Sequence, residues 1–395
     1  MTTLAPSARP SAFAVFRKRN FALLWFGSLI STSGSALTDL AAGILIYRMT
    51  GSALSVGLLF IVSALPSLIL GLLAGVFADR FDRKRIMVAS DLIRAALVLA
   101  IPAVLPFGIT WLYIVVLLSS AVKQFFDPAH ASVLPEVATD EELSAANALM
   151  EISSFGSTAI GFAAAGLIAS SFPIEWAFYL DGLSFLISAA CIALIRIAPS
   201  DTADRTTVTT VARDLRAGAR FLLDSPILRS LLILFVPTFL SIGLANVLLL
   251  PFSLTALHAT EFEYGLQEGL TSVGFVVGSL LMARLADRLR EGQWIAIGGM
   301  GMATAFFLYA LSSSIPLAIL FVTVSGFMNA LHAIGRRLAI QRNTTNEVRG
   351  RVSSAFFVTR DVVFLIGMAA AGLADLVGVR ALFLAAALVL LAAGG

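Results

Sequence analysis

The sequence predicts an all-α integral membrane protein with 12 transmembrane helices. Of its 395 residues, 58% are hydrophobic and 13% are charged, whereas a soluble domain carries about 25% charged residues. Apolar runs of about 18 residues or more recur along the chain, and each is long enough to cross a bilayer as a helix. The alternating segments of about ten residues that a transmembrane barrel requires are absent from the sequence.

The apolar runs form two sets of six, separated by one long polar stretch. That stretch begins with the composition of a flexible linker and continues as VARDLRAGARFLLDSP, which predicts an amphipathic helix on the membrane surface. We therefore expect an N-terminal six-helix bundle at 1–197, a cytoplasmic linker at 198–226 and a C-terminal six-helix bundle at 227–395. The last expected span is short and ends in two glycines. The expected spans are 21–47, 54–78, 86–105, 109–130, 144–170, 175–196, 228–256, 265–285, 293–312, 315–340, 352–374 and 378–395.

The distribution of Lys and Arg predicts the orientation of these spans. If the N-terminus is cytoplasmic, its side of the membrane collects nearly all basic loop residues, while the opposite side keeps little more than Arg48 and Arg380. Because short cytoplasmic loops are rich in Lys and Arg, we expect a cytoplasmic N-terminus. The same rule accounts for the net charge of +3 without a nucleic-acid partner.

The sequence indicates neither an enzyme nor a metal or cofactor site. Its single cysteine, Cys191, lies in an apolar run, so neither a disulfide within the chain nor a cysteine metal cluster can form. No nucleophile–base pair or nucleotide-binding loop is visible.

The two halves of the sequence resemble each other. Asp79-Arg80 corresponds to Asp287-Arg288, an offset of 208 residues, and the same offset relates Gly57 to Gly265. Repeats of six spans with the same orientation predict pseudo-two-fold symmetry about the membrane normal.

Three motifs carry a resemblance to a known family. They are GVFADRFDRKR at 75–85, a degenerate ADRLR at 286–290 and FDPAHASVLPEV at 126–137. The chain resembles the major facilitator superfamily of secondary transporters, and within it the branch that holds enterobactin and macrolide exporters. The resemblance implies two pseudo-symmetric six-helix bundles around a central cavity. Spans one, four, seven and ten would line that cavity, which would open alternately to each side of the membrane.

The resemblance also implies a conformational latch on the cytoplasmic side. Asp79 would dock on the N-terminus of span eleven, where unpaired backbone amides and the helix dipole favour an anion. Arg83 would pair with a carboxylate such as Asp127, and Asp287 would face span five near Ser144. Alternatively, this charge cluster is only a topology signal. The predicted latch comprises Gly75, Asp79, Arg80, Arg83, Lys84, Asp127, Asp287 and Arg288, with Arg80, Lys84 and Arg85 expected to meet lipid headgroups.

Ionisable residues inside the spans are candidates for coupling or substrate binding, because burying charge in a membrane is costly. Asp39, one turn after Ser35, is the favoured site for a proton or a cationic substrate, with Asp181 as the alternative. Asp91 and Arg94 are spaced to neutralise each other. Lys123 and Glu151 form either a structural ion pair or a coupling site, and His332 is either a proton carrier or a neutral hydrogen-bonded side chain. The candidates are Ser35, Asp39, Lys123, Gln124, Glu151, Asp181, Asn246, Asn329 and His332.

A glycine-rich segment in span five resembles the antiporter motif of this superfamily. Gly156, Gly161 and Gly166 are expected to let helices pack closely. Phe162 replaces the usual proline, and the arginine motif expected in span four is missing, so proton antiport is left open.

These patterns predict a secondary active transporter, most simply a proton-coupled exporter of amphipathic small molecules of drug or siderophore type. The 29 phenylalanines favour a bulky amphipathic substrate over a sugar. An importer or facilitator of a lipid, siderophore or metabolite is the alternative, and a non-transporting membrane sensor or scaffold is the alternative of another class. The expected partners are the substrate, protons or another coupling ion, and lipid. We expect a monomer in the bacterial inner membrane.

Overall fold

The computed structural model describes residues 12–78, 80–196, 216–217, 219–344 and 346–394, and this part of the chain contains helices but no strands. Eleven helices are long and apolar enough to span a membrane, and the twelfth, α14, has 16 residues. The predicted all-α membrane fold is confirmed. The main helices are α1 (Arg19–Thr50), α2 (Ala53–Ala78), α3 (Arg83–Val104), α4 (Ile109–Val137), α5 (Asp140–Ser171), α6 (Glu175–Leu194), α8 (Pro226–Pro251), α9 (Glu261–Leu285), α10 (Glu291–Leu311), α11 (Ile315–Arg342), α12 (Asn346–Ala370), α13 (Ala374–Val377) and α14 (Val379–Gly394). Short 3-10 or π segments are η1 (Ala12–Arg17), η2 (Leu105–Phe107), η3 (Phe252–Ala256), η4 (Ala286–Arg288) and η5 (Ala371–Leu373).

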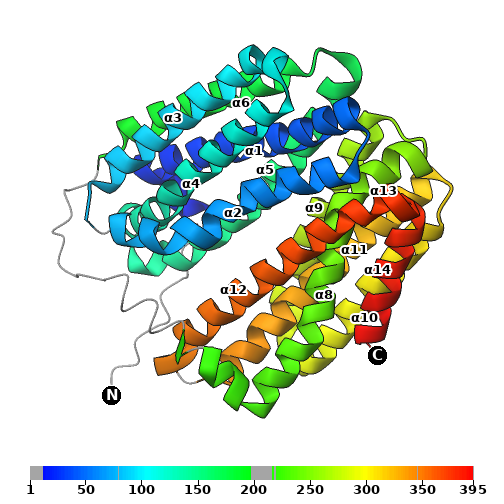
Figure 1. Ribbon diagram of the computed structural model, residues 1–395. Coiled ribbons are helices and arrows are strands. Elements are labelled where there is room, and N and C mark those ends of the chain that lie inside the picture. The colour runs from blue at the N-terminus through cyan, green and yellow to red at the C-terminus, as the bar shows by residue number, and fades with distance from the viewer. Residues whose placement is uncertain (1–11, 79, 197–215, 218, 345, 395) are drawn as a thin grey trace, which may run out of the picture.

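The helices form two halves. In the N-terminal half, α1 packs on α5 and α6, while α3 packs on α4 and α6; in the C-terminal half, α11 packs on α9 and α10, while α8 packs on α12 and α14. We call the side where α6 ends and α8 begins the linker side, and the opposite side the far side. Figure 1 shows the halves converging on the far side, near α13, and diverging toward the linker side.

The turns on the far side depend on glycines with left-handed backbone. Gly51 ends α1 with φ 62° and bonds back to the Tyr47 carbonyl, and Gly378 separates α13 from α14 with φ 87°. Side chains with a Cβ rarely adopt this conformation. The chain therefore reverses sharply between helices that must pack as antiparallel neighbours.

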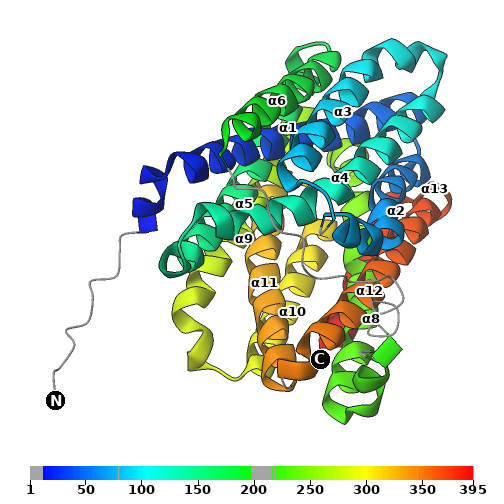
Figure 2. The same ribbon diagram turned by 90° about the vertical axis from the view of Figure 1, so that its left-hand side faces the viewer.

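The two halves touch most closely where α5 crosses α9, which lie side by side in Figure 2. A Cβ on Gly166 would lie 2.6 Å from the Glu261 carbonyl oxygen, and one on Gly265 would lie 2.6 Å from the Phe162 carbonyl oxygen. The other predicted packing glycines differ. Gly161 faces α1 within its own half, and a Cβ on Gly156 would meet nothing within 4 Å.

The described end of the linker is helical at 216–217 and 219–224. Leu222 is buried in a cluster with Leu228 and Phe235 of α8, whereas Phe221 is exposed. The predicted flexible stretch and the start of the predicted amphipathic helix fall within 197–215, which lies outside the described residues. The three-part division of the chain stays a prediction.

We predict that Gly166→Ala destabilises the protein and Gly156→Ala does not. The added methyl group at Gly166 would overlap the backbone of α9, and overpacking of this kind costs about 1–3 kcal/mol. The melting temperature of the purified protein should fall by a few degrees for Gly166→Ala and stay level or rise slightly for Gly156→Ala, because alanine favours helix more than glycine does. Equal melting temperatures would contradict the close crossing.

Candidate functional site

A cavity of about 710 Å³ lies between the two halves, in the linker-side part of the molecule. Helices α5, α9, α11 and α12 line it. Its apolar wall includes Phe155, Phe275, Leu280, Met282 and Phe357. Its size falls within the range of small-molecule sites, which are mostly apolar with a few polar groups.

The described side chains that line this cavity include three charged groups. Glu151 projects from α5 of the N-terminal half, whereas Arg336 and Arg337 belong to α11 of the C-terminal half. Ser279, Gln341 and Ser353 add uncharged polar groups. The cavity therefore combines an aromatic wall with excess positive charge on one side.

Spans one, four, seven and ten were expected to line the central cavity. Of these four, only the tenth, α11, contributes lining residues here, and the expectation is wrong for the other three. The halves separate on the linker side, so the space opens between α5 and the helices α9, α11 and α12. Of the expected lining residues, Glu151 reaches the cavity. Asn246 is exposed elsewhere on α8, and Asn329 is half-buried on α11.

A second, smaller cavity of about 170 Å³ lies inside the N-terminal half. Helices α1 to α4 contribute Ser35, Asp39, Arg94, Lys123 and polar hydroxyl groups to its lining. Arg94 donates a hydrogen bond from Nη2 to Ser35 Oγ at 3.1 Å. The structure thus places Ser35, Asp39 and Lys123 around one cavity inside the N-terminal half, whereas the sequence related Asp39 only to Ser35 and paired Lys123 with Glu151.

Arg94 is the central cation of the N-terminal half. Its charge interacts with Asp181, Asp91, Asp127 and Asp39. Its guanidinium carbon also lies 4.0 Å from the centroid of the Phe185 ring. No described carboxylate forms a direct ion pair with Arg94, and neither carboxylate oxygen of Asp91 has a hydrogen-bond partner, so the predicted direct pairing of Asp91 with Arg94 is not seen.

Asp181 lies between α6 and α1 and is 1% exposed. It accepts a hydrogen bond from Ser184 Oγ at 3.0 Å, and Gly34 of α1 lies directly against it. This carboxylate is therefore part of the packing within the N-terminal half and does not line the central cavity.

The predicted pair of Lys123 and Glu151 does not form. Lys123 bonds to Asp127 one turn further along α4, whereas Glu151 lines the central cavity. The spacing along an α-helix explains the pairing, since residues four apart are neighbours on its surface. Gln124 bonds within α4, donating to the Ser120 carbonyl at 3.2 Å.

His332 is buried inside the C-terminal half. Its Nδ1 lies 3.1 Å from the Ile295 carbonyl oxygen, and its ring packs edge-on against Phe235, with centroids 5.2 Å apart. The side chain is 2% exposed. This environment fits the neutral hydrogen-bonded alternative, in which Nδ1–H donates to the carbonyl.

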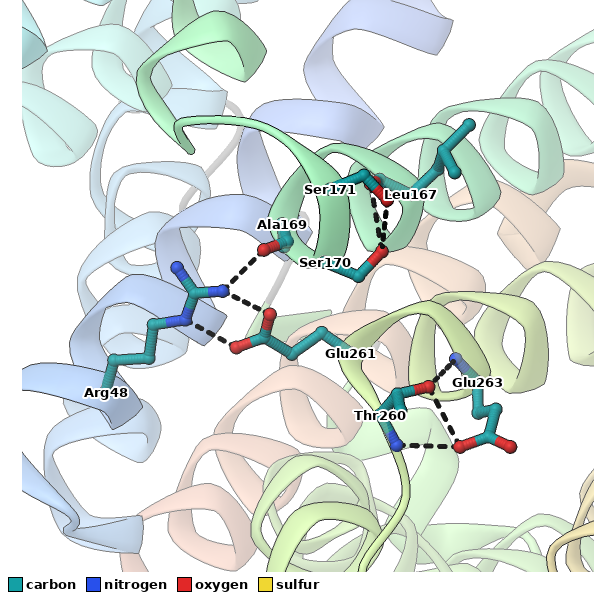
Figure 3. A network of polar contacts seen from close by, with 8 residues as sticks. All are labelled: Arg48, Leu167, Ala169, Ser170, Ser171, Thr260, Glu261 and Glu263. Carbon is teal, nitrogen blue, oxygen red and sulfur yellow. Dashed lines mark hydrogen bonds and ion pairs between the residues drawn. The ribbon is translucent and has the colours of Figure 1, made fainter.

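A charged contact joins the two halves on the far side. Arg48, at the end of α1, forms a two-pronged ion pair with Glu261 in the first turn of α9 (Figure 3). Arg48 Nη2 also donates to the Ala169 carbonyl in the last turn of α5, at 2.6 Å. Thr260 and Glu263 form a capping box that fixes the start of α9. This local structure presents Glu261 to Arg48.

A second contact on the far side places an anion on a helix N-terminus. Asp375 of α13 accepts hydrogen bonds from Ser52 Oγ at 2.6 Å, Ala53 N at 2.8 Å and Leu54 N at 3.3 Å. These groups form the start of α2. Unpaired amides and the helix dipole make that position favourable for a carboxylate. Asp375 therefore ties the C-terminal half to the N-terminal half.

The predicted latch is only partly described. Asp79 lies outside the described residues, so its docking on span eleven stays a prediction. Arg83 pairs with Glu136 at 2.5 Å instead of Asp127. Lys84 donates to the Ile195 carbonyl at 2.7 Å, within its own half, instead of reaching toward lipid.

The repeat of the latch in the C-terminal half differs from the prediction in the same way. Asp287 pairs with Arg342 at 3.0 Å and does not face Ser144. Because the halves are apart on the linker side, this carboxylate finds its partner within its own half. Arg342 also bonds to Glu291 at 3.0 Å. Gly75 has open space around it, and Arg80 and Arg288 are exposed.

These features define a polytopic membrane transporter: two helical halves, a cavity between them and a polar closure on one side. The model of the transmembrane secretion effector family matches residues 10–394. The chain belongs to this family of major facilitator transporters, and the expectation that it is not an enzyme is confirmed.

Similar proteins include several named exporters. The multidrug efflux pump Tap of Mycolicibacterium fortuitum is 27% identical over 94% of this chain and 93% of its own. Macrolide efflux protein A of Streptococcus pyogenes is 25% identical over 93% of this chain and 92% of its own. Among solved structures, the nucleoside transporter NupG has a TM-score of 0.78 at 13% identity, covering 95% of this chain and 97% of its own. The last likeness shows the fold alone.

Sequence reasoning missed the residues that close the far side. Arg48 was used only to assign orientation, as one of the few basic residues on that side. Glu261 and Asp375 were not singled out, because acidic residues are common at the starts of helices. Arg336 belongs to the basic residues that the orientation argument assigned collectively to the N-terminal side of the membrane, although it lies within the expected span 315–340. Its place inside a span was the signal that could have identified it.

We predict that Glu261→Gln opens the far side. Losing a partly exposed ion pair should shift the population of the two states roughly two- to fivefold. In a Cys191→Ala background, spin labels at Ser171 and Ser313, one in each half, should report longer distances by double electron–electron resonance.

Two controls accompany this measurement. Exchanging the charges in the double variant Arg48→Glu with Glu261→Arg should restore the short distance, and Glu175→Gln, on the same side, should leave it unchanged. Unchanged distances in Glu261→Gln would show that the ion pair does not hold the halves together.

Proposed function

We propose that this chain exports amphipathic small molecules across the bacterial inner membrane by alternating access. The observation that carries the proposal is the large, mostly apolar cavity between the halves, placed on the linker side while polar contacts close the far side. Two relatives that align along nearly their whole length are named efflux pumps, which supports the direction of transport.

The linker side is the cytoplasmic side in this proposal. Its loops carry most of the Lys and Arg residues, as cytoplasmic loops do, which also places the N-terminus in the cytoplasm. The structure then corresponds to the state that receives substrate from the cell interior or from the inner leaflet. Rocking of the halves would break the far-side contacts and close the cavity from the cytoplasm, with Asp79 docked on α12.

Proton coupling is assigned to the polar cavity of the N-terminal half. Asp39 lines it together with Arg94 and Lys123, and the charges of Asp181 and Asp127 act on the same Arg94. A proton on Asp39 would change the charge balance around Arg94 and so the packing of α1 against its neighbours. Coupling at this site supports antiport, in which proton entry drives substrate exit.

The transport proposal predicts that Ser279→Trp blocks transport. The indole would project into the central cavity and compete with the substrate for space, and a loss of about 1.4 kcal/mol of substrate binding corresponds to a roughly tenfold loss. The measurement is uptake of neutral, cationic and anionic amphipathic dyes into everted membrane vesicles. Val277→Trp, on the same helix but exposed outside the cavity, should transport normally. If the parent moves none of the dyes, or if Ser279→Trp moves them at the parent rate, the transport proposal fails.

The coupling proposal predicts that Asp39→Asn uncouples transport from the proton gradient. In everted vesicles with an acid interior, the parent should take up dye faster than in vesicles without a gradient. Asp39→Asn should show the same rate in both, because the amide cannot carry the proton, whereas Asp39→Glu should retain part of the stimulation. A parent whose rate ignores the gradient would remove the antiport proposal and leave facilitated export.

A further inference from the structure

Arg336 is held at the edge of the central cavity by aromatic rings. It lines the cavity from α11. Its guanidinium carbon lies 4.8 Å from the ring centroid of Phe239, 5.4 Å from that of Phe235 and 5.7 Å from that of Phe356. These three phenylalanines belong to one buried cluster of the C-terminal half. The rings fix the cation in position and contribute modest attraction.

No described residue offers Arg336 an ion pair or a hydrogen bond. The charge that acts on it from α12 is that of Arg360, another cation, which is itself paired with Asp361 at 2.6 Å. Arg337, the next residue, also lines the cavity. A half-buried cation without a partner is unfavourable unless something compensates it. The guanidinium has five N–H donors suited to a carboxylate or phosphate.

The one carboxylate among the described lining residues is Glu151, on α5 of the opposite half. It forms no ion pair with Arg336 in this structure. The cavity therefore has cations along α11 and a large apolar wall beside them, so a molecule with an anionic head and an apolar body would match both.

We propose that Arg336 binds the anionic group of the substrate, and that the exported molecules are amphipathic anions such as carboxylates, sulfonates or phosphates joined to an apolar body. This inference rests on the proposed transport function and names its substrate class. The apolar body lies against Phe155, Phe275 and Phe357, while Arg336 and Arg337 face the anion.

The test uses a matched pair of probes, dansyl-labelled undecanoate and its primary amide, which differ in the negative charge alone. Equilibrium dialysis against the protein in phosphatidylcholine nanodiscs, with empty nanodiscs as background, gives both affinities. The parent should bind the acid roughly tenfold more tightly than the amide, the usual value of a hydrogen-bonded charge. Arg336→Gln should lose that preference while still binding the amide, and Arg229→Gln, an exposed arginine at the start of α8, should keep it.

Two further arms complete the test. If Arg336→Gln does not fold, Arg336→Lys takes its place; it keeps the charge without the planar fork, so its preference should fall. Replacing part of the lipid with phosphatidylglycerol distinguishes the source of the anion. Equal weakening of acid binding in the parent and in Arg336→Gln would reflect the surface charge of the lipid and leave the inference standing, whereas a larger weakening in the parent would show a lipid headgroup in the anion site and overturn the assignment to an exported substrate.

Equal affinity for acid and amide in the parent would overturn the inference. So would an acid preference that survives intact in Arg336→Gln, or binding of neither probe. Dye transport without any preference for anions would leave the export function standing and refute the substrate class alone.

Discussion

Charged contacts on the far side hold the two halves together there, and the position of the cavity between the halves depends on them. Arg48 with Glu261, and Asp375 with the start of α2, join the halves on the far side. From there α5 and α9 run side by side past Gly166 and Gly265 to Phe155 and Phe275, whose rings are tilted against each other with centroids 4.5 Å apart. Beyond those rings the helices diverge and the cavity begins. The closed far side and the open cavity on the linker side therefore have one cause. Helices are rigid, so two halves held together at the far side diverge toward the linker side.

Helix α2 packs against α12, which continues into α13, and this pair can form a different helix-end contact in each of two conformations. In the structure a carboxylate from α13, Asp375, occupies the N-terminus of α2. The sequence predicts the mirror contact on the linker side, with Asp79 of the α2–α3 loop on the N-terminus of α12. Rocking would separate one contact as it forms the other. Each contact is of the same modest kind, a carboxylate on free helix amides, so neither state would be stabilised so strongly that transport stops.

The helices were predictable because hydropathy and length alone determine a membrane span. All 12 expected spans overlap observed helices, and most boundaries agree within a turn. The pairing of charges was less predictable. Sequence reasoning placed Arg83 on Asp127 and Asp287 near Ser144, whereas both find partners inside their own half. A sequence pattern does not specify which conformation of a transporter forms a given ion pair, whereas each ion pair in the structure belongs to a single conformation. The specific contacts of Arg48 and Arg336 were missed because the orientation rule for Lys and Arg already accounted for basic residues near the ends of spans.

The charges of the two halves are placed differently, and this difference constrains how coupling can work. In the N-terminal half, Asp39, Arg94 and Lys123 surround a small cavity inside the bundle. In the C-terminal half, Arg336 faces the large cavity. A proton and a substrate at these positions would not compete for one site, so their coupling would have to pass through helix packing. Helix α1 carries Asp39 and also Arg48, which bonds to Glu261 of the other half. A change in the charge around Arg94 that moves α1 would therefore act directly on the far-side closure, and in the proposed antiport this movement would link protonation to the opening of the cavity.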